Sequence, residues 1–283
     1  MWPDSNFMLE ALNKLDLLVV ADLFLTDSSK YADYILPVCS SLERSEFRAY
    51  VQRYVILTEP TIEPLFDSRP DTDIIFELAR RLNLNDPLIE ADYKTALDWI
   101  LEPSGISVDE LKKYPGGMAV PNPIKVEEKK YLKYGFATPS NKMEFTSSLL
   151  EKYSSTHGYD SLPVYQPPKL SAEQTPDLAK DYPMILNTGT RLPMFVHSRT
   201  FRLSWTKSLR PRAAADLNNA EAIGMGINQG DSINIITPKG QITVVANLTK
   251  MVQAGVVHMY YDYPEADVNI LIEADYLDPI SSY

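Results

Sequence analysis

The distribution of apolar residues predicts an α/β arrangement for the first third of the chain. Residues 17–21 form an uninterrupted apolar run that ends at Asp22, which is typical of a strand buried on both faces of a parallel sheet. The polar residues 26–29 are suited to start a short helix, and the apolar segment 34–36 then stops at Pro37. Parallel α/β sheets are built from this order of strand, helix and strand.

A longer helix is predicted after Pro70. The apolar positions 74, 75, 78, 79 and 82 fall on one helical face, and Arg80 and Arg81 lie near the C-terminal end, where cations are favourable. Residues 1–105 are therefore interpreted as part of an α/β domain. From 106 to 180, clusters such as YPGG, VPNPIK and LPVYQPP are rich in turn-forming residues, which indicates an extended connecting segment on the surface.

Short strands dominate the pattern of residues 181–283. Strand candidates are MILNTGT, DSINIITP, QITVVANL and GVVHMYY, and the middle two flank the turn residues 238–240 as in a hairpin. A short helix is expected at residues 218–224, where Asn218 is a favourable N-cap and Gly224 a favourable end. Short strands with one inserted helix are typical of a β-barrel.

Composition and charge narrow the possible partners. The chain carries 27 Lys and Arg against 38 Asp and Glu, a net charge of -11, which repels a phosphate backbone and argues against nucleic-acid binding. An anionic cofactor would therefore need a local binding site that outweighs the repulsion from the net negative charge of the chain. No run approaches the roughly 18 to 20 apolar residues of a membrane span, and the first residues lack the pattern of a signal peptide, which leaves cytoplasm and periplasm both open.

The sequence offers little metal or nucleophile chemistry of its own. The single cysteine, Cys39, excludes an internal disulfide, a zinc site built on several thiolates and a cluster that needs about four cysteines. Cys39 itself is interpreted as a small buried apolar residue, and His157 and His258 as structural residues. The sequence contains no nucleophile and base constellation, no phosphate-binding loop and no zinc-ligand spacing.

Seven segments, taken in order, resemble the C-terminal third of the dimethyl sulfoxide reductase family of molybdopterin oxidoreductases. Four lie in the first half of the chain: LLVVADLFLTDSSKYADYILP, SLERSEFRAYVQRYV, SRPDTDIIFELARRL and GFATPSNKMEF. Three lie in the second half: LNTGTRLPMFVHSRT, LNNAEAIGMGINQGDSINIITPKGQITV and AGVVHMYYDYPEADVNILIEADYLDPIS. Each segment alone is a common pattern, whereas the shared order across nearly the whole chain is specific.

The resemblance implies a fold and a cofactor. Residues 1–105 would be the C-terminal part of an α/β molybdopterin oxidoreductase domain, and residues 181–283 a double-psi β-barrel that binds molybdopterin guanine dinucleotide, with molybdenum or tungsten. The metal-ligating residue and a 4Fe–4S cluster are expected only in an N-terminal region absent from this sequence, so no catalytic or metal-binding residue is assigned here. The expected partners are that N-terminal remainder of the same enzyme and an electron-transfer subunit.

Two departures from the family's usual pattern suggest a branch. Glu46 occupies the usual Gly position and Arg48 follows Phe47, and Thr190 lies between Gly189 and Arg191, where the commonest pattern is one residue shorter. Both variations look closer to the branch that includes thiosulfate and polysulfide reductases and hydratase-like members than to nitrate reductases.

In the first domain, three residues are candidates for the guanine nucleotide. A carboxylate can accept from the ring N–H and the exocyclic amine of guanine together. By resemblance Asp71 is the candidate for this role, with Asp22 beside it at the end of a strand. The alternative for Asp71 is a helix cap after Pro70. Arg44 is a candidate for a phosphate or a stacking contact, and its alternative is an exposed surface cation.

In the second domain, the candidates cluster in two segments. Gly189 allows close backbone approach, the hydroxyls of Thr188 and Thr190 can donate, and Arg191 offers a planar fork to oxygen atoms. The alternative is an ordinary turn at a strand end. By resemblance, further contacts to the pterin or a phosphate are expected from His197, Ser198, Tyr261 and Asn269; the alternatives are a structural histidine, a core tyrosine and a turn asparagine.

A non-catalytic role remains the competing hypothesis. A double-psi barrel can also serve as a binding or interaction module, with the first half of the chain as a packing partner. The upstream sequence discriminates between the two: a four-cysteine motif and a metal-ligand segment there favour the enzyme, whereas an unrelated sequence favours the module.

Overall fold

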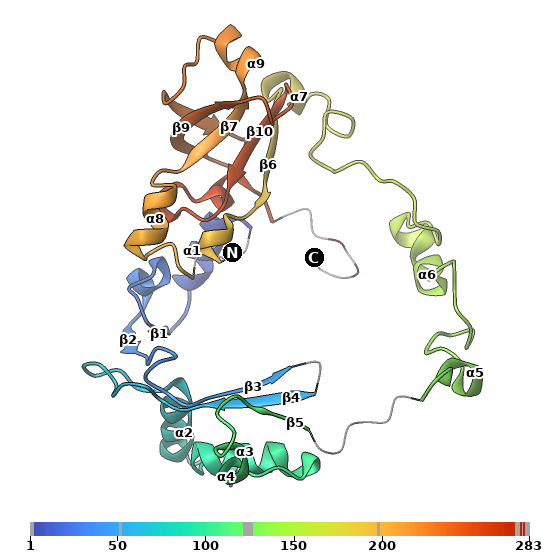
Figure 1. Ribbon diagram of the computed structural model, residues 1–283. Coiled ribbons are helices and arrows are strands. Elements are labelled where there is room, and N and C mark those ends of the chain that lie inside the picture. The colour runs from blue at the N-terminus through green and yellow to red at the C-terminus, as the bar shows by residue number, and fades with distance from the viewer. Residues whose placement is uncertain are drawn as a thin grey trace. The chain divides into compact units, whose positions relative to one another are not determined.

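The chain forms two compact units. The computed structural model describes residues 3–50, 53–120, 127–196, 199–274, 278 and 280 (Figure 1). One unit comprises residues 15–134, and the other comprises residues 1–14 together with 135–283. The division into compact units does not coincide with the domain boundaries expected at residues 105 and 180. These boundaries stay a prediction.

The first unit begins with the expected strand, helix and strand. Strand β1 (Val19–Asp22) pairs in parallel with β2 (Tyr34–Pro37), and the 3-10 helix η1 (Asp27–Tyr31) connects them. The side chains of Thr26 and Ser29 form a capping box that starts η1. The predicted burial of β1 on both faces is wrong: Val19 is 44% exposed, because neither hydrophobic core of the described residues includes β1.

A helix-backed antiparallel sheet completes this unit. Strands β3 (Glu46–Tyr50), β4 (Tyr54–Thr58) and β5 (Met118–Ala119) lie in the order β3-β4-β5. Figure 1 shows helices α3 (Tyr93–Leu101) and α4 (Val108–Leu111) along one face of the sheet. Their apolar side chains form one core with β4, which contains Val55, Leu57, Leu97, Leu101, Ile106, Val108 and Leu111. Residues 106–111, expected in the connecting segment, thus contribute to a core.

Short helices occupy the remaining segments. Helix α2 (Asp71–Leu82) follows Pro70 as predicted, although Ala79 is its one buried residue and Ile75, Leu78 and Leu82 of the predicted apolar face are exposed. The other helices outside the second sheet are η2 (Glu102–Ser104), α5 (Lys130–Tyr134), α6 (Ser148–His157), α7 (Leu178–Asp181) and, near the N-terminus, α1 (Ser5–Leu12).

The second unit contains a five-stranded mixed sheet. Its strands β6 (Ile185–Thr190), β7 (Ala214–Asn218), β8 (Ser232–Ile236), β9 (Gln241–Thr249) and β10 (Val256–Tyr260) lie in the order β6-β10-β7-β9-β8. The β6/β10 and β7/β9 pairs are parallel, whereas β10/β7 and the predicted β8/β9 hairpin are antiparallel. Among the described residues no pairing between β6 and β8 closes the sheet, so the double-psi barrel stays a prediction.

One face of this sheet and three 3-10 helices enclose the larger core. Ala215, Leu217, Val244, Ala246 and Met259 are buried there with residues of η3 (Pro193–Phe195), η4 (Pro264–Ala266) and η5 (Val268–Leu271).

Helix α8 (Ser204–Leu209) precedes β7. Helix α9 (Asn219–Gly224) begins as predicted, because the Asn218 side chain accepts hydrogen bonds from the N–H groups of Ala220 and Glu221. Within the described part of the chain, every helix is too short or too polar to cross a membrane.

The turn of the β8/β9 hairpin tolerates no larger residue at Gly240. A Cβ atom added there would lie 2.7 Å from the carbonyl oxygen of Ile270, a backbone atom that cannot move freely. We expect Gly240→Ala to lower the free energy of unfolding by about 1–3 kcal/mol, as overpacked sites do. Gly224→Ala is the matched control, because a Cβ there meets no described atom within 4 Å. Urea unfolding followed by circular dichroism checks this; equal stability of the two variants would contradict the close approach.

Tyr263 makes the stability of the second unit depend on alkaline pH. Its hydroxyl donates to the carbonyl oxygen of Arg210 over 2.9 Å, and burial raises the pKa of this phenol from 10.0 to about 12. Folding therefore gains stability from the neutral phenol below pH 10, and this contribution is lost as pH rises through 12.

We expect Tyr263→Phe to lose about 1 kcal/mol of unfolding free energy at neutral pH, the usual value of one hydrogen bond. Between pH 10 and 12 the variant should lose less stability than the parent does. Urea midpoints at neutral and alkaline pH measure both effects, with exposed Tyr114→Phe as control. Identical pH slopes for parent and Tyr263→Phe would show that this phenol is not the group responsible.

Candidate functional site

Two candidate residues lie along one edge of the first unit, where neighbouring segments end. Asp22 is the last residue of β1 and is the register partner of Pro37, the last residue of β2. On the other side of β2, the N–H of Arg69 donates to the carbonyl oxygen of Pro37, and the N–H of Cys39 donates to the carbonyl oxygen of Arg69. Asp71 follows two residues later. The carboxyl ends of parallel strands are where open α/β sheets bind ligands.

Asp71 and Arg44 form an ion pair at this edge. The guanidinium Nη1 of Arg44 donates to Oδ2 of Asp71, and the side chains are 29% and 44% exposed. Asp71 is the first residue of α2, and the N-cap is Pro70. The N-cap position expected as the alternative for Asp71 is thus occupied by Pro70, and Arg44, whose alternative was an exposed surface cation, is a partly exposed cation in an ion pair.

Glu43, a buried carboxylate next to Arg44, is absent from the candidates that the sequence predicts. Glu43 is 6% exposed and accepts hydrogen bonds from the backbone N–H of Ser40 (2.7 Å), the backbone N–H of Leu65 (2.6 Å) and the hydroxyl of Ser68 (3.3 Å). The hydrogen bonds from Ser40, and then from Leu65, lower the pKa of Glu43 to about 2. The Ser-Ser-Leu-Glu spacing, which resembles a capping box, was the available signal.

In the second unit, the Thr-Gly-Thr segment belongs to a strand. Strand β6 ends at Thr190, as the strand candidate MILNTGT predicts, and Thr190 pairs with Tyr260 of β10. Gly189 and Thr190 are exposed, and the space next to Gly189 is open, since a Cβ there would approach Asn187 Oδ1 at 3.9 Å and no closer described atom. Exposed Arg191 follows directly. The segment thus carries threonine hydroxyls, an accessible backbone at Gly189 and the guanidinium of Arg191 next to one another in the sequence.

A second buried carboxylate, which the sequence did not indicate either, anchors the end of this segment. Asp262 is 1% exposed, and its Oδ2 accepts from the backbone N–H of Leu192 over 2.7 Å. Its Oδ1 has no hydrogen-bond partner among the described residues. Tyr261, next to Asp262, packs against the core cluster. The contact brings the segment after β6 and the segment after β10 together, and no spacing in the sequence predicts it.

The remaining candidates are not observed beside the end of β6. Asn269 lies in η5, where its N–H donates to Asp267 Oδ1, and the following residues contact the 237–240 turn rather than the end of β6. His197 and Ser198 lie outside the described residues.

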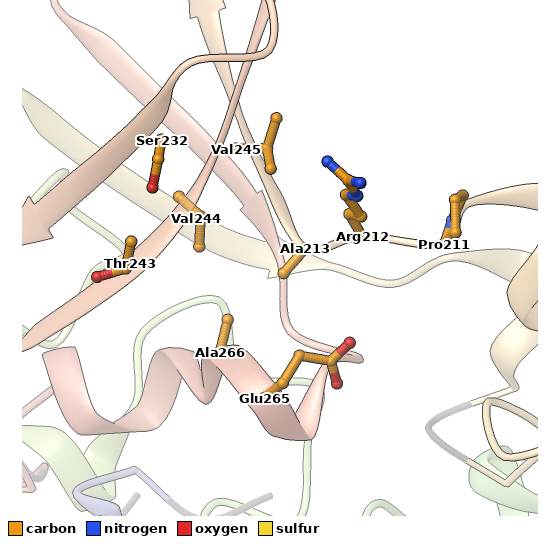
Figure 2. Close-up of a pocket in the computed structure, with 9 residues that line it drawn as sticks. All are labelled: Pro211, Arg212, Ala213, Ser232, Thr243, Val244, Val245, Glu265 and Ala266. Atoms are coloured by element: carbon orange, nitrogen blue, oxygen red, sulfur yellow. The ribbon is translucent and has the colours of Figure 1, made fainter.

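A shallow recess of about 210 Å³ lies elsewhere in the second unit, and none of the candidate residues lines it (Figure 2). Its lining includes the charged residues Arg212 and Glu265 and the apolar residues Val244 and Ala266, which Figure 2 labels.

Each of the two segments, taken by itself, offers donors and acceptors suited to a part of a nucleotide cofactor. A carboxylate with a neighbouring guanidinium complements the donor edge of guanine, while hydroxyls, a glycine backbone and a second guanidinium suit a diphosphate or a pterin. Within the described residues no group of three or more His, Cys, Asp or Glu side chains could hold a metal ion.

Two family models match the chain. The model described as "Molydopterin dinucleotide binding domain" matches residues 184–283, and the model described as "Molybdopterin oxidoreductase" matches residues 1–81. The first range contains the five-stranded sheet, and the second contains β1, β2, Glu43 and the Arg44–Asp71 pair.

Individual relatives agree with both models. The chain is 29% identical to acetylene hydratase from Syntrophotalea acetylenica, over 84% of this chain and 32% of the relative. It is 29% identical to a dimethyl sulfoxide reductase of Escherichia coli (strain K12), over 93% of this chain and 35% of the relative. It is 26% identical to the alpha subunit of an F420-dependent formate dehydrogenase from Methanocaldococcus jannaschii, over 95% and 38%. The chain thus spans only 32% to 38% of these relatives.

The fold is shared with a solved structure. Acetylene hydratase from Pelobacter acetylenicus superposes with a TM-score of 0.81 over 97% of this chain and 39% of that protein, at 24% identity. This similarity shows the shared fold. The two family models, in this order, and the relatives show that the chain belongs to the dimethyl sulfoxide reductase family of molybdopterin oxidoreductases and corresponds to their C-terminal portion.

Proposed function

We propose that this chain is the cofactor-binding C-terminal portion of a molybdenum- or tungsten-dependent oxidoreductase and that it holds a pyranopterin guanine dinucleotide. The observation that carries the proposal is the Arg44–Asp71 pair at the ligand-binding edge of a parallel sheet, within a range that the oxidoreductase family model matches. The match of residues 184–283 to the dinucleotide-binding model supports a second contact region in the other unit.

The first contact region recognises the nucleotide base. Asp71 accepts from the ring N–H and the exocyclic amine of guanine, two charge-assisted hydrogen bonds that reject bases without this pair of donors. Asp22 lies at the same sheet edge and accepts further ribose or base donors. Arg44 orients the Asp71 carboxylate through their ion pair, and its planar fork also reaches phosphate oxygens.

The second contact region holds the diphosphate or the pterin. Thr188, Thr190 and Arg191 supply donors around the open backbone at Gly189, and Asp262 fixes the backbone that follows. His197, Ser198, Tyr261 and Asn269 are proposed as further contacts. When bound, the cofactor supplies the electron and oxygen-atom chemistry, and this chain's residues bind it, orient it and exclude water.

The finer features of the family are proposed with the cofactor. We propose that residues 181–283 close into a double-psi barrel. Glu46 and Thr190, together with the similarity to acetylene hydratase, favour the branch that contains thiosulfate and polysulfide reductases and hydratase-like members.

The proposed partners are the N-terminal remainder of the enzyme and an electron-transfer subunit. Exposed apolar residues on β1, β2 and α2 support further packing partners: Val19, Ile35, Ile75, Leu78 and Leu82.

The test of the proposal is guanine-nucleotide retention by the intact, cofactor-loaded protein. Asp71→Asn replaces one acceptor oxygen by a donor that faces the donors of guanine. We expect the dissociation constant of the nucleotide to rise about 10-fold to 100-fold, the usual effect of losing a hydrogen bond to a charged group. After extensive dialysis, the guanosine monophosphate released by hydrolysis and counted per polypeptide should then fall below that of the parent.

Asp73→Asn is the matched control for this variant. It makes the same change in the same helical turn, at an exposed residue that takes part in no ion pair among the described residues. Unchanged nucleotide content in Asp71→Asn would remove Asp71 from the site. A parent protein that contains no guanine nucleotide would refute the proposed function as a whole.

A further inference from the structure

We propose that Glu43 is a positioning residue, which holds Arg44 and Asp71 in the arrangement that binds the guanine base. This inference rests on the proposed function, because it concerns the same nucleotide contact. Glu43 does not touch the ligand in this proposal; it acts through the two segments that carry the contact residues.

The hydrogen bonds of Glu43 connect those two segments directly. Oε2 accepts from the backbone N–H of Ser40, four residues before Arg44, and Oε1 accepts from the N–H of Leu65 and the hydroxyl of Ser68. Ser68 is three residues before Asp71 in the sequence. The carboxylate therefore joins the turn that leads into Arg44 to the loop that leads into Asp71.

Backbone hydrogen bonds tighten the same junction on both sides. The carbonyl oxygen of Leu42 accepts from the N–H groups of Thr61 (2.7 Å) and Ile62 (3.1 Å). The N–H of Cys39 donates to the carbonyl oxygen of Arg69 over 3.0 Å. Glu43 is the one buried charge of the junction among the described residues. Its carboxylate thus adds to a set of backbone contacts that already hold the two segments side by side.

The Arg44–Asp71 pair needs such support because its own attraction is weak. Both side chains are substantially exposed, and exposed ion pairs contribute little and leave long side chains free to reorient. Two segments held at fixed separation limit the positions from which the guanidinium and the carboxylate can meet. A carboxylate that has to face two guanine donors needs this kind of preorganisation.

Glu43 stays ionised over the physiological pH range, so the hydrogen bonds that it accepts do not change with pH there. The pKa of Glu43 is lowered to about 2, from 4.5, by the hydrogen bonds that it accepts. A depressed folded-state pKa contributes stability that is present above pH 4.5 and is lost as pH falls through 2. The carboxylate thus remains a charged acceptor throughout the physiological pH range.

The experiment compares Glu43→Gln with Glu63→Gln in the cofactor-loaded protein. Glu63 is exposed, lies in the same loop region and has no ion pair among the described residues, so it controls for the loss of one charge. The amide introduced at position 43 places a donor against the donors of Ser40, Leu65 or Ser68. We measure the rate at which guanine nucleotide is lost on dialysis, at a temperature where circular dichroism shows every variant folded.

We expect Glu43→Gln to release nucleotide about tenfold faster than the parent, the effect of one hydrogen bond to a charged group, and Glu63→Gln to match the parent. Amide hydrogen exchange at Ser40 and Leu65 should accelerate in the cofactor-free Glu43→Gln protein. Ser68→Ala removes one of the three donors and keeps the charge; it should raise the release rate by a smaller factor and so tests the proposal even if Glu43→Gln does not fold.

The outcomes separate this inference from the proposed function. Faster release from Glu43→Gln and Ser68→Ala, with Glu63→Gln unchanged, supports positioning. Nucleotide loss in Asp71→Asn together with parent-like release in Glu43→Gln and Ser68→Ala overturns the positioning role and leaves the proposed function standing. Faster amide exchange without faster release shows a structural role only, which also overturns it.

Discussion

The ion pair between Arg44 and Asp71 is the interaction on which the proposed role of this chain depends. It lies where β1, β2 and the segment before α2 end together, and it brings residues 27 positions apart into one binding edge. A charged pair that remains 29% and 44% exposed adds little to folding, so its significance lies in what it presents to a ligand. The buried carboxylate of Glu43, one residue away from Arg44, supplies the rigidity that the exposed pair lacks.

The second unit repeats this arrangement with different chemistry. Parallel strands β6 and β10 end side by side, and buried Asp262 joins the segments that follow them. The exposed end of β6 carries hydroxyls and a guanidinium on a backbone left open at Gly189. In both units a buried carboxylate bonded to backbone N–H groups fixes the segment that carries exposed polar side chains. This arrangement suits a large polar ligand. The side chains that contact the ligand stay exposed, while the buried carboxylate fixes the backbone that carries them.

Local signals in the sequence predicted the elements that local chemistry determines. The strand, helix and strand of β1–β2, the start of α2 after Pro70, the β8/β9 hairpin and α9 were confirmed, because caps, turns and apolar runs act within a few residues. Strand β7 was missed: AADLN has no β-branched residue, and its position in the sheet comes from pairing with β9 and β10. Likewise the exposure of β1, the Arg44–Asp71 pair and the Asp262 contact depend on partners distant in sequence, which no local pattern specifies.

The central claim is that the Asp71 carboxylate, paired with Arg44, binds the guanine base of the cofactor. A crystal or cryo-electron microscopy structure of the cofactor-loaded protein tests it most directly. We predict the guanine edge within hydrogen-bond distance of the Asp71 carboxylate. A bound cofactor whose guanine lies elsewhere, with the Asp71 carboxylate in contact with solvent alone, would contradict the claim.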